Sequence, residues 1–279
     1  LSLMKKLILP ALLIVSLIAC KKETSETETS PKPPSKEYDI NGYAQKGPYE
    51  IGATVTAHEL DNDLNPTGLS YSTVVKSHLG DYEFTDVGFS YNYVKIVVDG
   101  SYFHEIRNGI PFGEDLKLEV IADLSKSTEI NINVLTCVQQ ARLKYLVSKG
   151  TAFDEAREKS YDELLNIFSL NRGNLDFPEE LDLVSHDYNG AVLFAISNII
   201  ANKIGAVGYN IPQVILSLTI DFEKDGTIDE TWLQKTLASS ALLLDLNEPA
   251  SNLIDRYSTL GETVNPLVLN KILQDFILQ

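Results

Sequence analysis

Apolar and polar residues alternate with a period near two from residue 38 to about residue 123, the spacing typical of strands. Four segments carry this alternation and are predicted strands: GATVTAHEL (52–60), GDYEFTDV (80–87), YVKIVVDGSYFHEI (93–106) and DLKLEVIADL (115–124). A Gly-Asp turn opens the second, and Asp99 and Gly100 predict a hairpin turn within the third. Several short strands at this spacing predict an antiparallel β-sandwich over residues 37–125.

From about Ile130 the period becomes helical. Val134, Val138, Ala141 and Tyr145 fall on one helical face, and the adjacent Lys149 and Gly150 predict where that helix stops. Further helical patterns occupy six later segments: 153–168, 190–204, 211–220, 227–246, 250–260 and 266–277. The sequence therefore predicts a β domain followed by an all-α domain over residues 126–279.

The start of the chain has a different pattern. Lys5 and Lys6 precede the apolar run LILPALLIVSLIA (7–19), which is too short as a helix to cross a hydrocarbon core of about 30 Å. The order of charge, apolar run and polar continuation is typical of a signal peptide over residues 1–19. The last residues before Cys20, together with it (LIAC), resemble the lipobox of bacterial lipoproteins. That resemblance implies that Cys20 is lipidated and becomes the mature N-terminus; the alternative is an ordinary secretory signal.

Residues 20–36 contain charged residues, Ser, Thr and Pro, and after Cys20 no apolar residue to bury. Such a composition predicts a disordered tether between the lipid anchor and the folded part. Lysines followed by Glu23 and Glu26 resemble export signals that send some lipoproteins to the cell surface. The expected location is the outer membrane, with the periplasmic face and the cell-surface face as the two alternatives.

Several segments resemble a group of uncharacterised surface lipoproteins of Gram-negative bacteria: VTAHELDNDLNPTGLSYST, GDYEF, DGSYFHEI, INVLTCVQQARLKYLVSKGTAFDEA and DFEKDGTID. Their β part is similar to carboxypeptidase-regulatory-like or transthyretin-like Ig-type sandwiches. The resemblance implies an Ig/transthyretin-like sandwich, a C-terminal helical domain and attachment to the outer membrane. It implies no activity.

Charge and cysteine content narrow the function classes. The 279 residues carry a formal net charge of -16, which disfavours contact with phosphate backbones, so we expect no nucleic-acid partner. The two cysteines are Cys20 and Cys137. If Cys20 is acylated, Cys137 has no disulfide partner, and its apolar helical neighbours predict a buried structural thiol.

The segment DFEKDGTIDETW (221–232) is the sharpest candidate metal site. Oxygen-bearing side chains and one glycine fall at calcium-loop spacing, as Asp221, Glu223, Asp225, Gly226, Thr227 and Asp229. Position twelve, where a bidentate Glu belongs, is Trp232. The alternative is a helix start, in which Gly226 turns the chain and Thr227 with Glu230 forms a capping box. We expect no other cofactor.

Three further groups of residues have weaker signals. The loop DNDLNPTG (61–68) spaces acidic residues like cation ligands, but its Asn-Pro and Thr-Gly pairs favour a turn between strands. The segment HEIRN (104–108) is half of a zinc-protease HExxH, yet it follows a strand-like run instead of lying on a helix. The histidines His58, His78 and His186 have no ligand partner nearby in sequence, so surface or packing roles are expected.

Nucleophile elbows, phosphate loops and dinucleotide fingerprints are absent from the sequence. The prediction is a non-enzymatic, membrane-tethered binding or assembly module for a cell-envelope protein or glycan. Five tyrosines of the β region would suit stacking on sugars or strand packing: Tyr71, Tyr82, Tyr91, Tyr93 and Tyr102. The alternative function is a hydrolase of extracellular polymers, with a carboxylate pair in the helical domain or the interdomain cleft.

Overall fold

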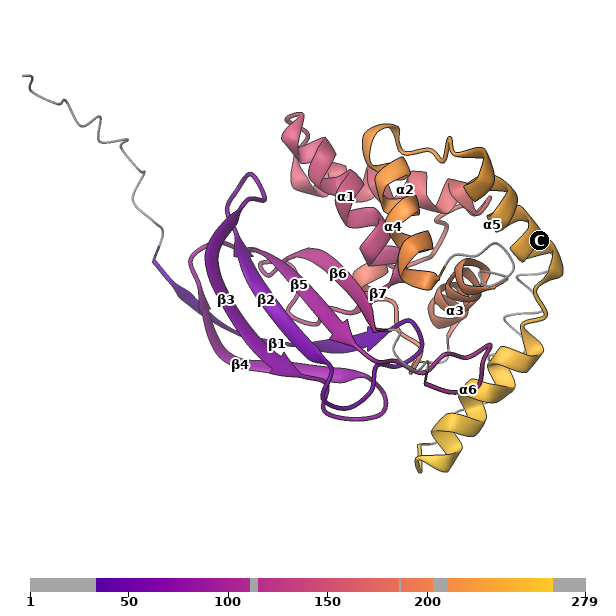
Figure 1. Cartoon of the computed structure of the whole chain (residues 1–279). Helices are drawn as coiled ribbons and strands as arrows, with labels where there is room; N and C mark the ends of the chain where they lie inside the picture. The colour runs from indigo at the N-terminus through magenta and orange to yellow at the C-terminus, as the bar shows by residue number, and fades with distance from the viewer. Residues whose placement is uncertain (1–33, 111–114, 186, 203–209, 263–279) are drawn as a thin grey trace, which may run out of the picture. The chain divides into compact units, whose positions relative to one another are not determined.

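The computed structural model describes residues 34–110, 115–185, 187–202 and 210–262 (Figure 1). The predicted signal peptide, most of the predicted tether and the last predicted helix lie outside these residues. Seven strands come first in the described chain: β1 (Lys36–Gln45), β2 (Thr54–Leu60), β3 (Pro66–Val74), β4 (Asp81–Phe89), β5 (Tyr93–Gly100), β6 (Leu116–Asp123) and β7 (Ile132–Asn133). Helices follow, so the predicted order of β then α is confirmed.

The strands form two sheets. One has the order β4-β1-β7 and the other β3-β2-β5-β6. All pairs are antiparallel except β1 with β7, which are parallel. The alternation of the sequence determines the inward faces: in β1, Tyr38 and Ile40 are buried while Asp39 is exposed.

The hairpin predicted at Asp99 and Gly100 is wrong. Strand β5 does end at Gly100, but the chain returns as β6 only at Leu116, which pairs with Gly100. The intervening segment makes its own contacts, because Tyr102 bridges to Tyr49 instead of to a hairpin partner. Burial of these two tyrosines outweighs the local turn preference of an Asp-Gly pair.

Six α-helices and one short 3-10 helix follow the strands in the described chain: α1 (Val134–Ser148), α2 (Phe153–Ile167), η1 (Pro178–Glu180), α3 (Tyr188–Ala201), α4 (Ile211–Asp225), α5 (Thr231–Leu243) and α6 (Asn247–Thr259). Helix α1 begins where Asn133 accepts a hydrogen bond from the Thr136 N–H and its own N–H donates to the Thr136 hydroxyl, each at 3.0 Å. It ends at Ser148; Lys149 is the C-cap and Gly150 follows with φ 90°, so the stop predicted at these two residues is confirmed.

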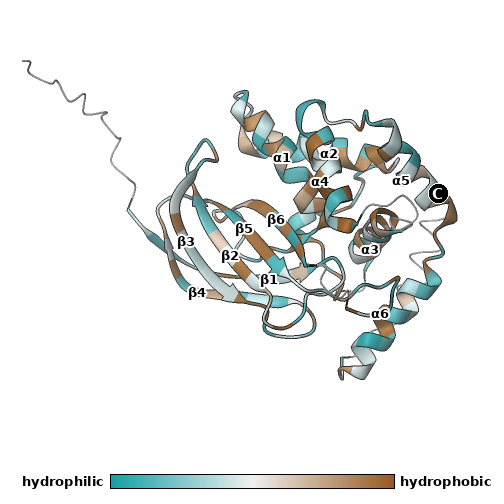
Figure 2. Ribbon diagram, in the orientation of Figure 1, coloured by the Kyte–Doolittle hydropathy of each residue, from teal (hydrophilic) through white to brown (hydrophobic). Residues whose placement is uncertain are grey.

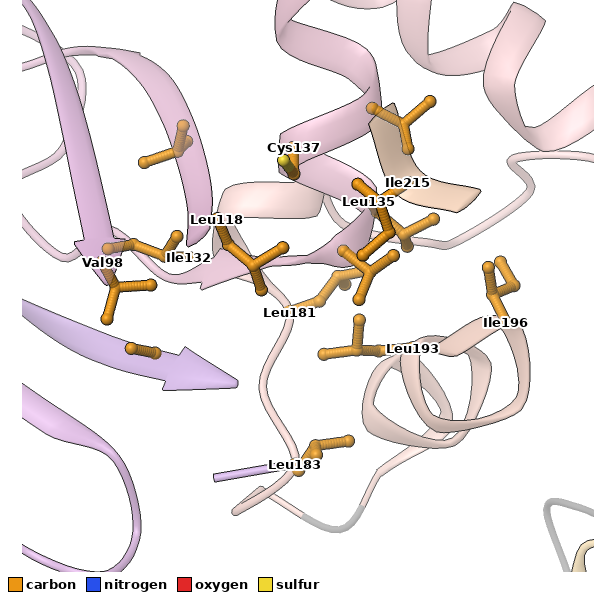
Figure 3. Packing of buried hydrophobic residues seen from close by; sticks show 14 of the residues in the cluster. Val98, Leu118, Ile132, Leu135, Cys137, Leu181, Leu183, Leu193, Ile196 and Ile215 are labelled. Atoms are coloured by element: carbon orange, nitrogen blue, oxygen red, sulfur yellow. The ribbon is translucent and has the colours of Figure 1, made fainter. Parts of the chain in front are cut away.

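Apolar side chains of strands and helices belong to one core cluster. Figure 3 shows Val98 and Leu118 from the strands in one continuous region with Leu135, Leu193 and Ile215 from helices. Nearly all of α3 is buried, and its ribbon is largely brown in Figure 2, as expected of a helix apolar on every side. The boundary predicted near residue 125 falls between β6 and β7, and side chains on both sides of it share this core.

A smaller apolar cluster joins the four-stranded sheet to the first two helices. Ile121 of β6 packs there with Leu143 and Leu146 of α1 and Ala156 of α2. None of the helices in the described ranges combines the length and apolar character needed to cross a membrane.

Candidate functional site

The loops that follow β1 and β5 meet in a buried ion pair. Lys46 Nζ lies 2.6 Å from Glu105 Oε2, and both side chains are fully buried. A lysine is rarely buried unless it is paired, so the position of Lys46 depends on this carboxylate. Burial raises the pKa of Glu105, and the attraction of Lys46 opposes that shift. The ion pair therefore holds the two loops together inside the protein.

Helices α3 and α6 fasten these loops. The Ser197 hydroxyl of α3 donates to the Lys46 carbonyl at 2.6 Å, and the Asn252 amide of α6 donates to the Glu105 carbonyl at 2.7 Å. Arg256 of α6 donates through Nη2 to both carboxylate oxygens of Glu50, at 2.8 and 3.0 Å. These contacts join strands to helices; Glu50 uses both carboxylate oxygens, whereas Glu105 uses Oε2 and its Oε1 is buried without a hydrogen bond.

The HEIRN segment forms a turn closed by a bridge between His104 and Gly109. This confirms that the segment does not have the helical geometry of a zinc-protease motif. His104 is only 2% exposed. Burial, followed by the charges of Lys46 and Arg107, lowers the pKa of His104 to about 3, so the imidazole is neutral in the folded protein.

The 221–232 segment divides between a helix and a loop. Helix α4 continues through Asp225, and Gly226 ends it with φ 79°. The left-handed φ favours glycine here, and a Cβ at Gly226 would lie 2.4 Å from the Glu163 carboxylate, which would have to shift. Because helical residues advance about 100° each, Glu223 lies on the far side of the helix from Asp221 and Asp225.

The carboxylates of this segment accept hydrogen bonds from the loop. Asp225 Oδ1 accepts from the Thr227 N–H at 3.0 Å and from its hydroxyl at 2.9 Å, and these bonds lower the pKa of Asp225. Asp221 Oδ2 accepts from the N–H groups of Asp229 and Glu230, at 2.9 and 3.0 Å. The arrangement organises the turn before α5; whether it binds calcium remains a prediction for titration.

The helix start predicted at Thr227 with Glu230 as a capping box is wrong in its details. Helix α5 begins at Thr231, and Glu230 makes no side-chain capping bond. Asp221 supplies the acceptor from the preceding helix instead. Because Asp221 lies in the preceding helix, no local sequence pattern marks it as the residue that supports the start of α5. The spacing of Thr227 and Glu230 matches a local capping box, and the sequence therefore predicted Thr227 instead.

Three surface hollows accompany these features. One of about 460 Å3 lies among mainly apolar residues that include Phe168, Ile199 and Leu237. A second, of about 540 Å3, is bordered by residues of the 221–232 segment, Trp232 among them. A third, of about 330 Å3, has five carboxylates, all on the C-terminal side of the predicted domain boundary: Glu129, Asp176, Glu180, Asp182 and Asp187. We call this third one the acidic hollow.

Most carboxylates of the acidic hollow have local partners. Asp182 accepts from the Val184 and Ser185 N–H groups, both at 2.6 Å, and Asp187 caps α3 through the Gly190 N–H at 2.9 Å. Across the described ranges, no three His, Cys, Asp or Glu side chains are grouped so that they could hold a metal ion.

The structure also locates Cys137 and the 61–68 loop, two further features predicted from the sequence. Cys137 is a buried free thiol of α1, as predicted, and burial raises its pKa to about 12. In the segment predicted as a loop over 61–68, Asp61 Oδ1 accepts from the Asp63 and Asn65 N–H groups, which confirms a turn over 61–65, whereas residues 66–68 already belong to β3. Cys20 and His186 lie outside the described residues.

For three of the five tyrosines, the structure supports the packing role and not the stacking on sugars. Tyr82 and Tyr102 are buried in the core, and the Tyr82 hydroxyl donates to the Ile130 carbonyl at 2.6 Å. Tyr93 stacks on Phe153 with ring centroids 4.6 Å apart. These three rings are therefore committed to internal contacts.

Strand β3 was not predicted from the sequence. It forms one edge of the four-stranded sheet, at the side of that sheet away from β6 in Figure 1. Ser70 and Ser72 are exposed, and Val74 is 46% exposed. Its sequence, PTGLSYSTV, lacks a strong apolar alternation, so only its high content of Thr, Ser, Tyr and Val could have indicated a strand.

Comparisons of the chain with protein-family models, with curated proteins and with solved structures found no match.

Proposed function

We propose that this protein is a membrane-anchored extracytoplasmic lipoprotein that acts as a non-enzymatic binding or assembly module. The sequence around Cys20 supports the anchor, and the polar segment that follows supports a tether. The two sheets support an Ig- or transthyretin-like sandwich as the folded part. The ligand class is a protein or glycan of the cell envelope, and the outer membrane is the proposed location.

The observation that carries this proposal is the contrast between the buried ionic groups and the open strand β3. The Lys46–Glu105 pair is sealed inside the protein, whereas β3 presents exposed Ser and Thr side chains and is an edge strand, hydrogen-bonded in the described sheet to β2 alone. A sheet edge of this kind serves recognition by main-chain hydrogen bonding.

Photocrosslinking from β3 in intact cells tests the proposal. A photoreactive amino acid at Ser70 is expected to yield a discrete adduct, whereas the same group at Ser239, exposed on α5, yields none. Adducts from neither position, together with turnover of an envelope polymer by the purified protein, would overturn the proposal in favour of an enzyme.

One observation favours a hydrolase as the second candidate. The acidic hollow gathers Glu129, from the segment before β7, and Glu180 of η1, and a polymer chain could bind between these carboxylates. In that case, Glu129→Gln and Glu180→Gln each abolish the release of reducing ends from envelope glycans. Glu158→Gln, at an exposed position of α2, is the matched control and leaves that release unchanged.

A further inference from the structure

We infer that Asn108 is a site of spontaneous covalent modification, in which the main-chain nitrogen of Gly109 displaces the side-chain amide and the residue becomes aspartate or isoaspartate. Both residues lie in the turn of residues 104–109, which a bridge between His104 and Gly109 closes. The inference goes beyond the proposed function and does not depend on it.

The reaction needs water as its only co-reactant. The Gly109 nitrogen loses its proton to solvent hydroxide and forms a bond with Asn108 Cγ. The Cγ–Nδ2 bond breaks, and ammonia leaves with a proton from water, so that a five-membered succinimide ring remains. A water molecule then opens the ring at one of its two carbonyls, which gives aspartate or isoaspartate. In sum, one amide and one water become one carboxylate and one ammonium ion.

The local structure leaves this reaction unhindered. Asn108 is exposed and has φ 50°, a left-handed conformation that Asn adopts more readily than most residues. Gly109 is not among the residues with positive φ, and a Cβ there would meet nothing closer than the Arg107 carbonyl oxygen, at 3.9 Å. The fold therefore does not require glycine at this position, yet its missing side chain opens the path from the nitrogen to Asn108 Cγ.

The attacking nitrogen is held weakly. The Gly109 N–H donates to the His104 carbonyl at 3.4 Å, whereas the reverse bond, from the His104 N–H to the Gly109 carbonyl, is 2.8 Å long. Strong N–H to oxygen bonds have donor–acceptor distances of about 2.7–3.2 Å, so the first bond breaks more easily than the second. The nitrogen can be released while the other bond keeps the turn closed.

The sequence contains two other Asn-Gly pairs, and the fold protects both. Asn41 and Gly42 lie within β1, where Asn41 pairs with Glu83 of β4. On its other side, the Asn41 N–H donates to the Thr128 carbonyl at 3.0 Å, and its carbonyl accepts from the Ile130 N–H at 2.8 Å. These bonds hold Asn41 extended, and the ring cannot form until they break.

The third pair, Asn189 and Gly190, lies in the first turn of α3. The Gly190 N–H, which would be the attacking group, donates to Asp187 Oδ1 at 2.9 Å. The Asn189 amide donates to Asp176 Oδ2 at 2.5 Å. Nucleophile and leaving group are both engaged, so Asn108 is the reactive member of the three pairs.

The modification changes the turn that carries the buried ion pair. Isoaspartate adds one methylene to the main chain between the two residues of the bridge. Glu105, in the same turn, holds Lys46 at 2.6 Å through its side chain, and its carbonyl accepts from the Asn252 amide of α6 at 2.7 Å. A longer main chain shifts these groups, so the isoaspartate form should lose part of the attachment of α6.

Peptide mass mapping during incubation of the purified full-length protein at mildly alkaline pH tests the inference. In the folded protein, the peptide with Asn108 should gain the mass of an amide-to-acid change at least about tenfold faster than the peptides with Asn41 and Asn189, which must open locally first. In urea, where neither strand nor helix protects them, the three rates should agree within about threefold.

Two variants separate the chemistry from its consequence. Gly109→Ala should slow the reaction at Asn108 at least about tenfold, because the methyl group hinders the nitrogen, and should leave the urea midpoint nearly unchanged, because the Cβ fits. Asn108→Asp carries the charge of the product on a normal main chain. Its urea midpoint should match that of the unsubstituted protein, whereas the isoaspartate form, isolated by ion exchange, should unfold at lower urea.

A reaction at Asn108 that is no faster than at Asn41 and Asn189 in the folded protein overturns the inference. So does a rate that Gly109→Ala leaves unchanged. An isoaspartate form with the urea midpoint of Asn108→Asp overturns the proposed effect on the turn.

Discussion

At the scale of single residues, the Lys46–Glu105 ion pair joins the loops that follow β1 and β5, in addition to the apolar core that strands and helices share. Each partner keeps the other from being an isolated buried charge, which costs several kcal/mol. The carbonyls of the same two residues accept hydrogen bonds from α3 and α6. A change at either residue therefore acts on both parts of the fold.

Lys46→Met is expected to lower the free energy of unfolding by about 3–5 kcal/mol, because it leaves the Glu105 carboxylate buried without its cation. The double variant Lys46→Met with Glu105→Leu should regain most of the loss, since no charge stays buried. Urea denaturation of the three proteins measures both effects. The exposed pair Lys76–Glu83 gives the control: Lys76→Met should cost under about 1 kcal/mol. Equal losses for the two lysines would contradict the structural role.

His104 gives the protein a dependence on pH. Its pKa is lowered to about 3 in the folded state, so on acidification the unfolded chain takes up the proton first, below its ordinary pKa near 6.5. Stability should therefore fall as pH drops from about 6.5 toward 3, by up to about 1.4 kcal/mol per pH unit. Denaturation of His104→Gln should show a shallower fall between pH 6.5 and 5. A fall as steep as that of the unsubstituted protein would show that other groups cause it.

At the scale of elements, the join between α4 and α5 depends on Asp221. Asp221→Ala removes the acceptor for the N–H groups of Asp229 and Glu230 and should lower the stability by about 1 kcal/mol. Because we assign the carboxylate to these bonds, the loss should be the same in calcium and in chelator. Glu223→Ala, which lies on the same helix, is the control and should have little effect. Heat on calcium titration, or a melting temperature raised by calcium in the unsubstituted protein alone, would support a metal site instead.

The elements that sequence reasoning found are those with strong local signals. The apolar periodicity and Gly150 sufficed for α1, and the Gly-Asp turn sufficed for the start of β4. Strand β3 was missed because an exposed edge strand needs no apolar alternation. The turn at Asp99 and Gly100 was misplaced because Tyr102 pairs with Tyr49, a contact about fifty residues distant. Lys46 could not be predicted as buried, since its partner Glu105 is equally distant.

At the scale of the whole molecule, the proposed lipid anchor at Cys20 is a prediction that can be tested directly. Cys20→Ala should abolish incorporation of labelled fatty acid and release the protein from membranes, because the acyl chains supply the membrane affinity. Metabolic labelling and sedimentation measure the two effects, with Ser16→Ala as a control that keeps the thiol. A Cys20→Ala protein that still labels and sediments with membranes would contradict lipidation at this residue.

The hydrogen bond from Ser197 to the Lys46 carbonyl and the ion pair of Arg256 with Glu50 also constrain the order of folding. Synthesis proceeds from the N-terminus, so the loop after β1 emerges about 150 residues before Ser197 and about 200 before Arg256. Until then this loop has no helix to cover it, however early the strands pair. A protease or chaperone that acts during synthesis therefore encounters an open end of the sheets, which closes only when the last described helix has been made.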